Sequence, residues 1–321
     1  MKNLQKKLLI PLITLFLGAF IFLPFNNFVS AQGLQVQGLG IDPFLIEIDM
    51  AAGEVQTRSI TLTNTTNAPL TFTASINDFI PNGSTGQPQF LDANIESDSK
   101  FSLSRWITVT RQPEFTIPPQ SQTEVAFTIN VPVDAEPGTH FGGILFGQPL
   151  GAKPPSGPAV IQKAGAIILV KLGESQEKVQ VSQFFTQQKV YQSGPIEFLI
   201  SLHNFGNVHS KPKGDITIRN FWGRQVAQVP VNPDAQIILP ESGRDFSQTW
   251  NKKIGFGRYT AESVLYYGSP KLELRSQTSF WIIPMKEISL GVLFALILGI
   301  IGYIGVRQYN KYIIKHSRDE N

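Results

Sequence analysis

Hydrophobic and polar residues alternate along several stretches of the chain, and turn-forming residues separate these stretches. Every second residue is apolar over 59–63, 70–77 and 125–131. A period of two is typical of β-strands that bury one face. Clusters of Gly, Pro and Asn supply the turns between them. The repeated short strands predict an immunoglobulin-like β-sandwich over residues 32–150.

A second series of strand patterns follows residues 151–158, whose mix of Pro and Gly is typical of a semi-rigid linker. The continuous apolar run Ala164–Leu172 is expected to be the first strand of this series, and Thr278–Ile283 the last. About seven or eight strands over about 120 residues are typical of one immunoglobulin-like domain. We therefore expect a second, tandem sandwich over residues 159–284 and an all-β fold outside the membrane.

An uncharged segment near the C-terminus, Ile288–Val306, has the length of a transmembrane helix. It holds 19 residues without a charge, close to the roughly 20 that cross a bilayer as an α-helix. Four basic residues follow in the tail 307–321, namely Arg307, Lys311, Lys315 and Arg318. Because basic flanks stay in the cytoplasm, we expect a single-pass cell-membrane protein with its N-terminus outside and its C-terminus cytoplasmic. The last strand runs almost directly into this span, which places the second sandwich close to the membrane.

The N-terminus has the three parts of a signal peptide. Lys2, Lys6 and Lys7 precede an apolar run over 8–23, and small residues stand at the positions that signal peptidase reads. Cleavage is expected between Ala31 and Gln32, which makes residues 1–31 the signal peptide. The alternative is that this segment stays attached as an N-terminal anchor.

Small residues recur along one face of the expected membrane helix. Gly291, Ala295 and Gly299 are four residues apart, a spacing that lets two helices approach closely. This face is a candidate helix-packing surface. Gly and Ala are also common in single spans that have no helical partner.

The distribution of charge explains the basic sequence pI of about 9.0. Of the 27 basic residues, three lie in 1–31 and four in 307–321, and two of the 24 acidic residues lie in that tail. Residues 32–306 therefore hold 20 basic and 22 acidic residues, a formal charge of −2. The excess of positive charge belongs to the targeting ends, so we expect no nucleic-acid partner.

The chain contains no cysteine. An exported protein of this kind must be stabilised by core burial, without disulfides or thiolate chemistry. Animal cell-surface receptors commonly carry an inter-sheet disulfide in such domains. The composition therefore favours a bacterial surface protein.

Candidate chemical residues are few. His140, His203 and His209 lie in the expected external part, and His203 and His209 flank an Asn-Phe-Gly-Asn turn where they could in principle hold a metal. We interpret all three as structural histidines. Motifs for hydrolases, zinc proteases, nucleotide binding and calcium binding are missing from the sequence. We expect no enzyme, no catalytic or metal-binding residue and no cofactor.

Two further features bear on binding. Phe221-Trp222 is a large aromatic pair at an expected hairpin, which would anchor a partner if exposed; we favour a buried, core position for it. The long loop from Asn77 to Ser99 is the better binding candidate, because functional contacts concentrate on loops held by a rigid scaffold. Unpaired strand edges offer another route, since a partner could add a strand there.

Several segments resemble a known bacterial family. These are Gly53–Pro69 (GEVQTRSITLTNTTNAP), Arg105-Trp106-Ile107, Ile117–Val131 and Pro137–Ile144. They resemble the N-terminal domain of the WxL-interacting surface proteins of Gram-positive bacteria, and are also similar to the sandwiches of pilus chaperones and the major sperm protein. The segments His203–His209 and Phe280–Pro284, before a span and a basic tail, fit the same plan.

The resemblance implies that the first domain associates with peptidoglycan and the second with host or partner proteins. No ligand residue is carried over from it. The leading hypothesis is a surface adhesion or scaffold protein whose partner is a cell-wall polymer or a surface protein. The alternatives are a membrane-anchored assembly chaperone for pili or secreted subunits and, on the mere presence of Ser, Asp and His, an exported hydrolase.

Overall fold

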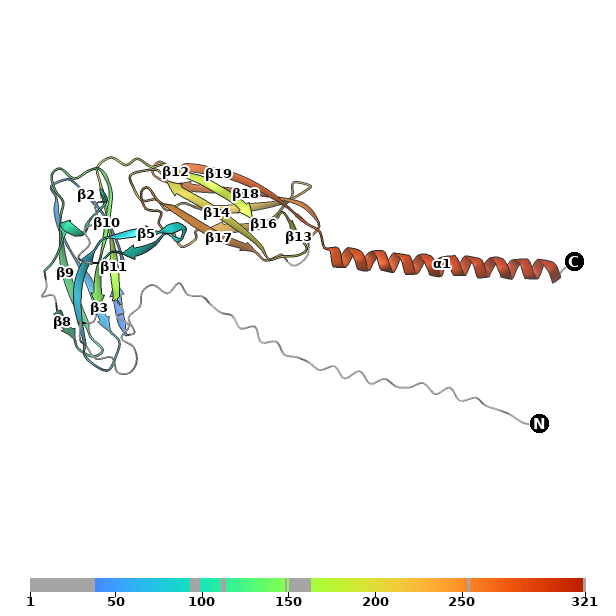
Figure 1. Ribbon diagram of the computed structural model, residues 1–321, viewed down its shortest axis with the longest axis horizontal. Helices are drawn as coiled ribbons and strands as arrows, with labels where there is room; N and C mark the ends of the chain where they lie inside the picture. Colours follow the sequence, from blue (N-terminus) through green and yellow to red (C-terminus); the bar gives the residue numbers. More distant parts are fainter. Residues whose placement is uncertain are drawn as a thin grey trace, which may run out of the picture. The chain divides into compact units, whose positions relative to one another are not determined.

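The computed structural model describes residues 38–92, 99–110, 114–147, 149, 163–252 and 255–319. Up to residue 282 these form strands and short 3-10 helices, and the helix α1 follows (Figure 1). The all-β fold expected from the alternating pattern is confirmed. The expected signal peptide with its cleavage site at Ala31 and Gln32, and the expected linker 151–158, lie outside the described residues.

The first group of strands forms a β-sandwich around one core. Its sheets have the strand orders β1-β3-β9-β7 and β2-β11-β10-β4-β8. The strands are β1 (Leu39–Asp42), β2 (Leu45–Met50), β3 (Val55–Asn64), β4 (Leu70–Asn77), β7 (Ile107–Val109), β8 (Glu114–Ile117), β9 (Gln122–Asn130), β10 (Gly138–Gly147) and β11 (Lys163–Leu172). Inward-facing residues such as Ile60, Phe72 and Phe127 are fully buried. This one-sided burial is the cause of the alternating pattern.

Strand β11 belongs to the first sandwich, so its assignment to a second domain starting at residue 159 is wrong. It pairs antiparallel with β10 along its whole length and parallel with β2. Ala166, Ile168 and Val170 point into the first core. The strand is apolar on both faces because it lies inside a sheet that is covered on both sides. The chain thus enters the second sandwich only after Leu172.

The second group of strands forms another sandwich. Its sheets have the orders β12-β14-β17 and β13-β19-β18-β15-β16. The strands are β12 (Val179–Thr186), β13 (Val190–Tyr191), β14 (Ile196–Asn204), β15 (Lys213–Asn220), β16 (Gln225–Val231), β17 (Gly243–Trp250), β18 (Gly257–Tyr267) and β19 (Leu272–Ile282). Phe198, Ile216 and Phe280 lie at the centre of its core. Two tandem sandwiches were expected, and both are present.

The segment expected to be a long loop is a hairpin. Strands β5 (Phe79–Asn82) and β6 (Gln87–Phe90) pair around the 3-10 turn η1 (Gly83–Thr85), and the short helix η2 (Ser104–Trp106) follows later. Arg244 on β17 donates hydrogen bonds to the backbone oxygens of Gly86 and Ile237, at 3.4 and 2.9 Å. The hairpin tip therefore contacts the second sandwich. The interpretation of Asn77 to Ser99 as a long loop is wrong for its described part, and its role in binding stays a prediction.

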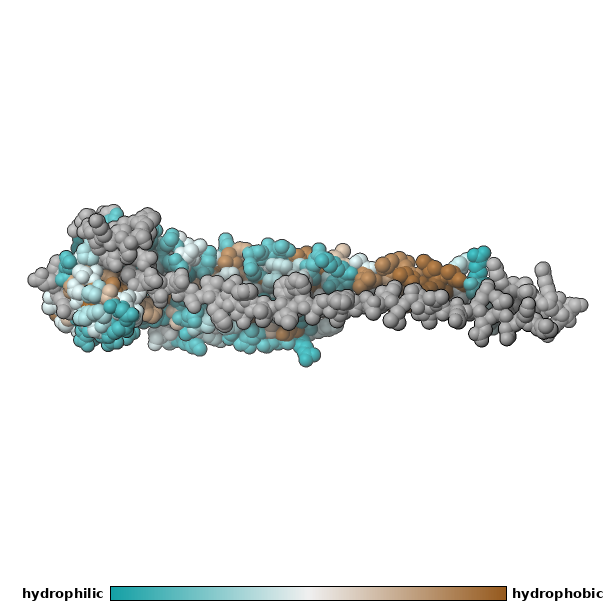
Figure 2. All heavy atoms as spheres, turned by 90° about the horizontal axis from the view of Figure 1, so that it is seen from below, coloured by the Kyte–Doolittle hydropathy of each residue, from teal (hydrophilic) through white to brown (hydrophobic). Residues whose placement is uncertain are grey.

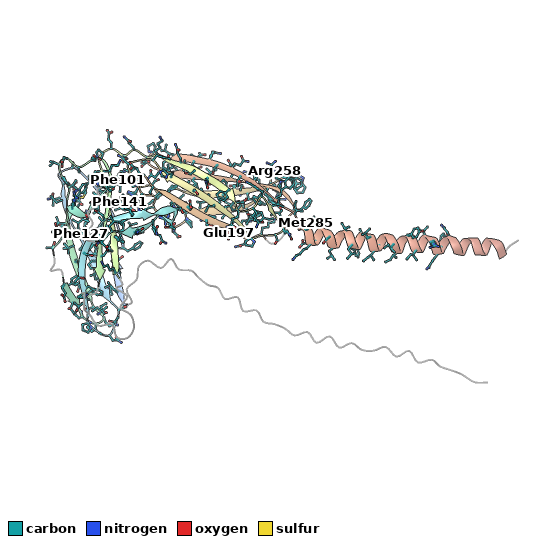
Figure 3. All side chains as sticks on the ribbon, in the orientation of Figure 1. Phe101, Phe127, Phe141, Glu197, Arg258 and Met285 are labelled. Atoms are coloured by element: carbon teal, nitrogen blue, oxygen red, sulfur yellow. The ribbon has the colours of Figure 1, made fainter. Side chains whose placement is uncertain are left out.

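A third apolar cluster joins the two sandwiches. Phe79, Phe101, Phe141 and Leu169 come from the first sandwich and its hairpin, and Leu239 comes from the second. The Phe101 and Phe141 rings stack with their centroids 5.9 Å apart, and both residues are labelled in Figure 3. The cluster covers the outer face of the sheet that contains β10 and β11. Burial of this kind contributes roughly 1.5–3 kcal/mol for each large apolar side chain.

The helix α1 extends over Met285–Asp319 and contains the expected span Ile288–Val306. Residues Met285–Asn310 are long and apolar enough to cross a membrane. Their side chains have no protein around them, and a continuous hydrophobic surface follows the helix in Figure 2. An apolar helix without protein cover has the composition of a lipid-facing span.

Candidate functional site

The outer face of the sheet β1-β3-β9-β7 differs from the other outer face of the first sandwich. The third apolar cluster covers the opposite sheet, whereas the outward residues of β3 and β9 are exposed or half-buried. On β3 the inward positions are Ile60 and Leu62, so Ser59 and Thr61 point outward. This face is an open sheet surface in the described part of the first sandwich.

Hydroxyl groups dominate this open face. We call it the hydroxyl face and define it by Thr57, Ser59, Thr61, Thr63, Thr108 and Thr128. Strand β9 lies between β3 and β7. Its Thr128 pairs with Thr57 on β3 and with Thr108 on β7. The hydroxyl oxygens of Thr57 and Thr128 are 3.0 Å apart. Strand pairing therefore brings hydroxyls from three strands onto one surface.

Each hydroxyl can donate one hydrogen bond and accept others. Two acidic residues share the face, because Asp42 and Glu124 both pair with Thr61 in the register. The surface thus offers many short polar groups on a regular strand spacing. Such a surface is suited to hydrogen bonding along an extended polar polymer.

His209 lies at the junction of the two sandwiches. Its Nδ1 atom is 3.0 Å from the hydroxyl oxygen of Thr139, and its Nε2 atom is 3.9 Å from Glu47 Oε2. Lys211 Nζ also approaches Glu47, at 2.6 Å. Burial lowers the pKa of His209 below its usual value, and the nearby carboxylate of Glu47 opposes this effect. His209 belongs to the second sandwich, and Thr139 and Glu47 belong to the first, so these contacts join the two domains.

The other two histidines lie apart from that contact. His140 Nε2 is 2.9 Å from the backbone oxygen of Glu136, and its ring lies 4.3 Å from that of Trp106. Burial lowers the pKa of His140. The ring of His203 lies 4.3 Å from that of Phe205. No group of three or more His, Cys, Asp or Glu within the described ranges is placed to hold a metal ion.

A small open pocket lies beside His140. Its lining comes from both sandwiches and consists of Lys100, Phe101, Glu136, Pro137, His140 and Asn207. Asn207 donates a hydrogen bond to the backbone oxygen of Pro137 at 3.1 Å, and Thr139 N–H donates one to the backbone oxygen of Asn207 at 2.8 Å. These contacts hold the domains together, so we assign the pocket to the junction.

The aromatic pair Phe221-Trp222 is exposed, and the interpretation of the pair as core is wrong. The side chains are 51% and 76% exposed. They occupy the turn between β15 and β16, where the chain leaves the sheet and no neighbouring strand covers them. The predicted helix-packing residues Gly291, Ala295 and Gly299 are also exposed on α1. Packing of a second helix on that face stays a prediction.

Sequence comparison links one segment to a described family. Residues 46–148 match the family model described as "WxL Interacting Protein, peptidoglycan binding domain". The resemblance to WxL-interacting proteins is confirmed for this segment. The match covers β2 to β10 and so includes most strands of the first sandwich, with Thr57, Ser59, Thr108 and Thr128 inside it. Among curated proteins, none matches the chain.

Solved structures with a similar fold include pilus chaperones and a related human domain. The class 5 fimbriae chaperone CfaA is 14% identical, with 75% of this chain and 98% of that chain covered and a TM-score of 0.39. The E. coli chaperone DraB is 12% identical, with 76% and 96% covered and a TM-score of 0.36. A PapD-like domain of human CEP192 is 11% identical, with 48% and 98% covered and a TM-score of 0.29. All three TM-scores are below 0.5, so nothing about this chain is argued from these likenesses.

The hydroxyl face was not singled out from the sequence. Its signal was present in the alternating run Ser59-Ile60-Thr61-Leu62-Thr63, which indicated only a strand with one polar side. Which polar side stays open depends on the third apolar cluster, whose members come from segments far apart in the chain. Alternation within a strand carries no information about that packing.

Proposed function

We propose that this chain is a membrane-anchored cell-surface protein whose first sandwich binds peptidoglycan through the hydroxyl face. The observation that carries the proposal is the match of residues 46–148 to the peptidoglycan-binding domain of WxL-interacting proteins. Peptidoglycan is an extended polymer of sugars and short peptides, rich in hydroxyl and amide groups. A face of short hydroxyl side chains can exchange hydrogen bonds with such groups without a deep pocket.

The signal peptide and the C-terminal helix determine where the protein is proposed to lie in the cell. α1 spans the membrane, and the basic residues Arg307, Lys311 and Lys315 hold its C-terminus in the cytoplasm. Both sandwiches then lie outside the membrane, on the side of the cell wall. The signal peptide 1–31 directs them there. The role is one of holding the wall, and the proposal includes no catalysis.

Sedimentation with purified peptidoglycan sacculi tests this function. The full-length protein in detergent is expected to sediment with sacculi, and the double variant Ser59→Glu, Thr128→Glu is expected to lose about tenfold in affinity. The two carboxylates replace short hydroxyls on neighbouring strands and add charge to the centre of the face. Both positions are solvent-accessible in the sheet, so the fold is expected to remain intact.

A matched control comes from the other sheet. Thr71 and Thr116 form a similar cross-strand pair on β4 and β8, with their hydroxyl oxygens 2.8 Å apart. Thr71→Glu together with Thr116→Glu adds the same two charges outside the hydroxyl face and is expected to leave sedimentation unchanged. Equal losses in the two variants would place binding elsewhere. A wild-type protein that stays in solution with sacculi but captures secreted subunits would instead favour the assembly-chaperone alternative.

A further inference from the structure

Exposed aromatic side chains gather at one end of the second sandwich. Phe221 and Trp222 occupy the turn after β15, Phe256 immediately precedes β18, and Trp281 lies near the end of β19. Phe256 is 63% exposed and Trp281 47% exposed. Single exposed apolar residues are common on soluble proteins, but a group of large rings marks a binding surface. We call these four residues the aromatic end.

The strand register places the four rings at the same level. Asn220 pairs with Tyr259, so the turn residues that follow it reach the level of Arg258 and Gly257. Gly257 in turn pairs with Ile282, the last residue of β19. The aromatic end therefore lies where β15 and β19 end and β18 begins. We call this level of the sheet its last row, and the chain leaves the sandwich there.

Local packing fixes the direction of the turn. The ring centroids of Phe221 and Trp222 are 3.7 Å apart. The Phe221 ring also covers Gly257, where an added Cβ atom would lie 3.0 Å from Phe221 Cδ1. Gly257 has a φ of 95°, a value that favours glycine. The pair is thus held in place by its own scaffold while its outer surface stays exposed.

The same row leads directly into α1. Only Ile283 and Pro284 stand between β19 and α1, which begins at Met285. Two residues extend over at most about 7 Å. Ile283 N–H donates a hydrogen bond to the backbone oxygen of Tyr191 at 2.8 Å, and Ile288 N–H donates one to that of Pro284 at 3.0 Å. The connection is therefore short and tied at both ends.

A short connection sets the distance between the sandwich and the membrane. The polar layer of one leaflet is about 5–8 Å thick, from the difference between the full bilayer and its hydrocarbon core. If α1 spans the bilayer from Ile288, as the proposed function requires, the link of at most about 7 Å and the three helical residues before Ile288, about 4.5 Å long, keep the last row of the sheet at or just outside this layer. Trp and Tyr are enriched at that level, where their apolar and polar parts are both solvated. Phe is found with Trp on the apolar side of protein segments that lie in the membrane surface.

Basic side chains accompany the rings. Arg224 follows the aromatic turn, Arg258 pairs with Trp281 across the strands, and Lys189 lies next to Val190, which also pairs with Trp281. All three are exposed. Figure 3 shows Arg258 at the end of the sandwich from which Met285 begins α1, with the acidic residue Glu197 also at this end. Arg and Lys donate hydrogen bonds to phosphate groups, so they suit lipid headgroups.

We propose that the aromatic end docks on the bilayer surface beside α1. Phe221, Trp222 and Phe256 enter the headgroup layer, and Arg224 and Arg258 contact lipid phosphates. The occupant is the lipid surface itself, because the two-residue connection brings this end of the sandwich to the bilayer. The proposal rests on the membrane anchoring in the proposed function. It adds a second contact that holds the sandwich in a fixed orientation on the membrane.

Fluorescence quenching in vesicles tests the docking. The full-length protein is reconstituted in phosphatidylglycerol and phosphatidylcholine vesicles, with and without lipids brominated near the headgroup. The difference between the wild type and Trp222→Phe isolates the emission of Trp222. We expect this emission to be quenched by the brominated lipids and protected at least about twofold from aqueous acrylamide, as for an interfacial ring. Strong acrylamide quenching without bromine quenching would overturn the proposal.

A second set of variants separates docking from anchoring. Phe221→Ser together with Phe256→Ser is expected to restore acrylamide access to Trp222, whereas Phe205→Ser is the matched control. Phe205 is 53% exposed and follows the opposite end of β14. Flotation of the same vesicles reports anchoring by α1. Protein that floats but keeps Trp222 in water overturns the docking alone, and protein that does not float overturns both the anchoring and the docking.

Discussion

Each of the two sandwiches contains a fully buried asparagine at the end of one strand, and its side chain bonds to the backbone of neighbouring loops. At the end of β3, Asn64 is fully buried and donates hydrogen bonds to the backbone oxygens of Ala68 and Ile117, at 2.8 and 3.1 Å. At the end of β14, Asn204 is also fully buried and donates to those of Val208 and Ile238, at 2.7 and 3.2 Å. Each side-chain oxygen accepts a backbone N–H two residues later. We call these the asparagine corners.

The two sandwiches have similar asparagine corners, but their exposed surfaces differ. The first sandwich exposes a sheet face of hydroxyl groups, and the second exposes rings at the end of its strands. A buried amide is constrained by several hydrogen bonds at once, so few other side chains can replace it. An exposed side chain has no such constraint. The comparison indicates that the asparagine corner belongs to the scaffold, while the open surfaces can differ between the domains and are where binding is proposed.

The asparagine corners are expected to give the largest effects. Asn64→Ala and Asn204→Ala each leave buried backbone groups without partners, at a cost of roughly 1–3 kcal/mol for each unsatisfied group. We expect a total loss of about 3 kcal/mol of unfolding free energy for either variant, measured by urea denaturation. Similar losses would support a shared scaffold.

Asn67→Ala is the control, because Asn67 is exposed and its side chain accepts only one 3.2 Å hydrogen bond, from Gln120. It is expected to change stability by less than about 0.5 kcal/mol. If Asn204→Ala behaved like this control while Asn64→Ala did not, the two corners would not be equivalent.

Leu239→Ala tests how far the sandwiches depend on each other. Leu239 is the buried residue that the second sandwich contributes to the third apolar cluster. Its truncation leaves a cavity, and we expect a loss of about 2–3 kcal/mol. Circular dichroism and tryptophan fluorescence during urea denaturation report whether the domains then unfold separately. Phe44→Ala, at a residue that is 68% exposed, serves as the control.

Protonation of His209 is expected to weaken the junction. Burial lowers the pKa of His209 in the folded state, so the unfolded chain takes up the proton at a higher pH than the folded one does. The free energy of unfolding therefore falls as the pH drops below the usual histidine pKa of about 6.5. His140, whose pKa is also lowered by burial, acts in the same direction.

Urea denaturation at pH 7.5 and 5.5 measures this dependence. His209→Gln keeps a side chain that can bond to Thr139 but cannot become charged, so its stability is expected to vary less with pH. His203→Gln is the comparison, because His203 lies away from Glu47 and Thr139. An unchanged pH dependence in His209→Gln would show that the junction does not titrate through this residue.

The smallest effect is expected at the surface of the junction. Lys100 Nζ lies 2.6 Å from Glu241 Oε1 and joins the two sandwiches, but both side chains are about half exposed. Exposed ion pairs are screened by water and salt. Lys100→Gln is expected to leave the urea midpoint unchanged within error at 0.15 M salt. A clear decrease would mean that this pair orders the junction.

Much of the fold could be predicted from the sequence because its signals are local. The alternation over 59–63 and 125–131 reports one-sided burial within a strand, and the charge-free run Ile288–Val306 reports a helix suited to lipid. The assignment of β11 failed because an apolar strand fits either sandwich. Its partners β2 and β10 are known only from the register.

The surfaces proposed to bind were harder to predict because the exposure of a side chain depends on residues far away in the sequence. Phe221-Trp222 has the composition of a core pair, and only the end of the sheet at Asn220 leaves it uncovered. The hairpin at 79–90 was expected to be part of a long loop because of its Gly, Pro and Asn content, but Arg244, from a strand over 150 residues later, bonds to its tip. Both features depend on elements that meet only in three dimensions.

Strand β11 gives the molecule a mechanical property. If the first sandwich holds the cell wall and α1 the membrane, as proposed, stretching of the envelope puts the chain between them under tension. That tension reaches the first sandwich through β11, its last strand, which is hydrogen-bonded to β10 on one side and β2 on the other. A pull along the strand axis would load these hydrogen bonds together, in shear. The strand at which the domain boundary was misplaced would then share the load with the apolar cluster between the sandwiches.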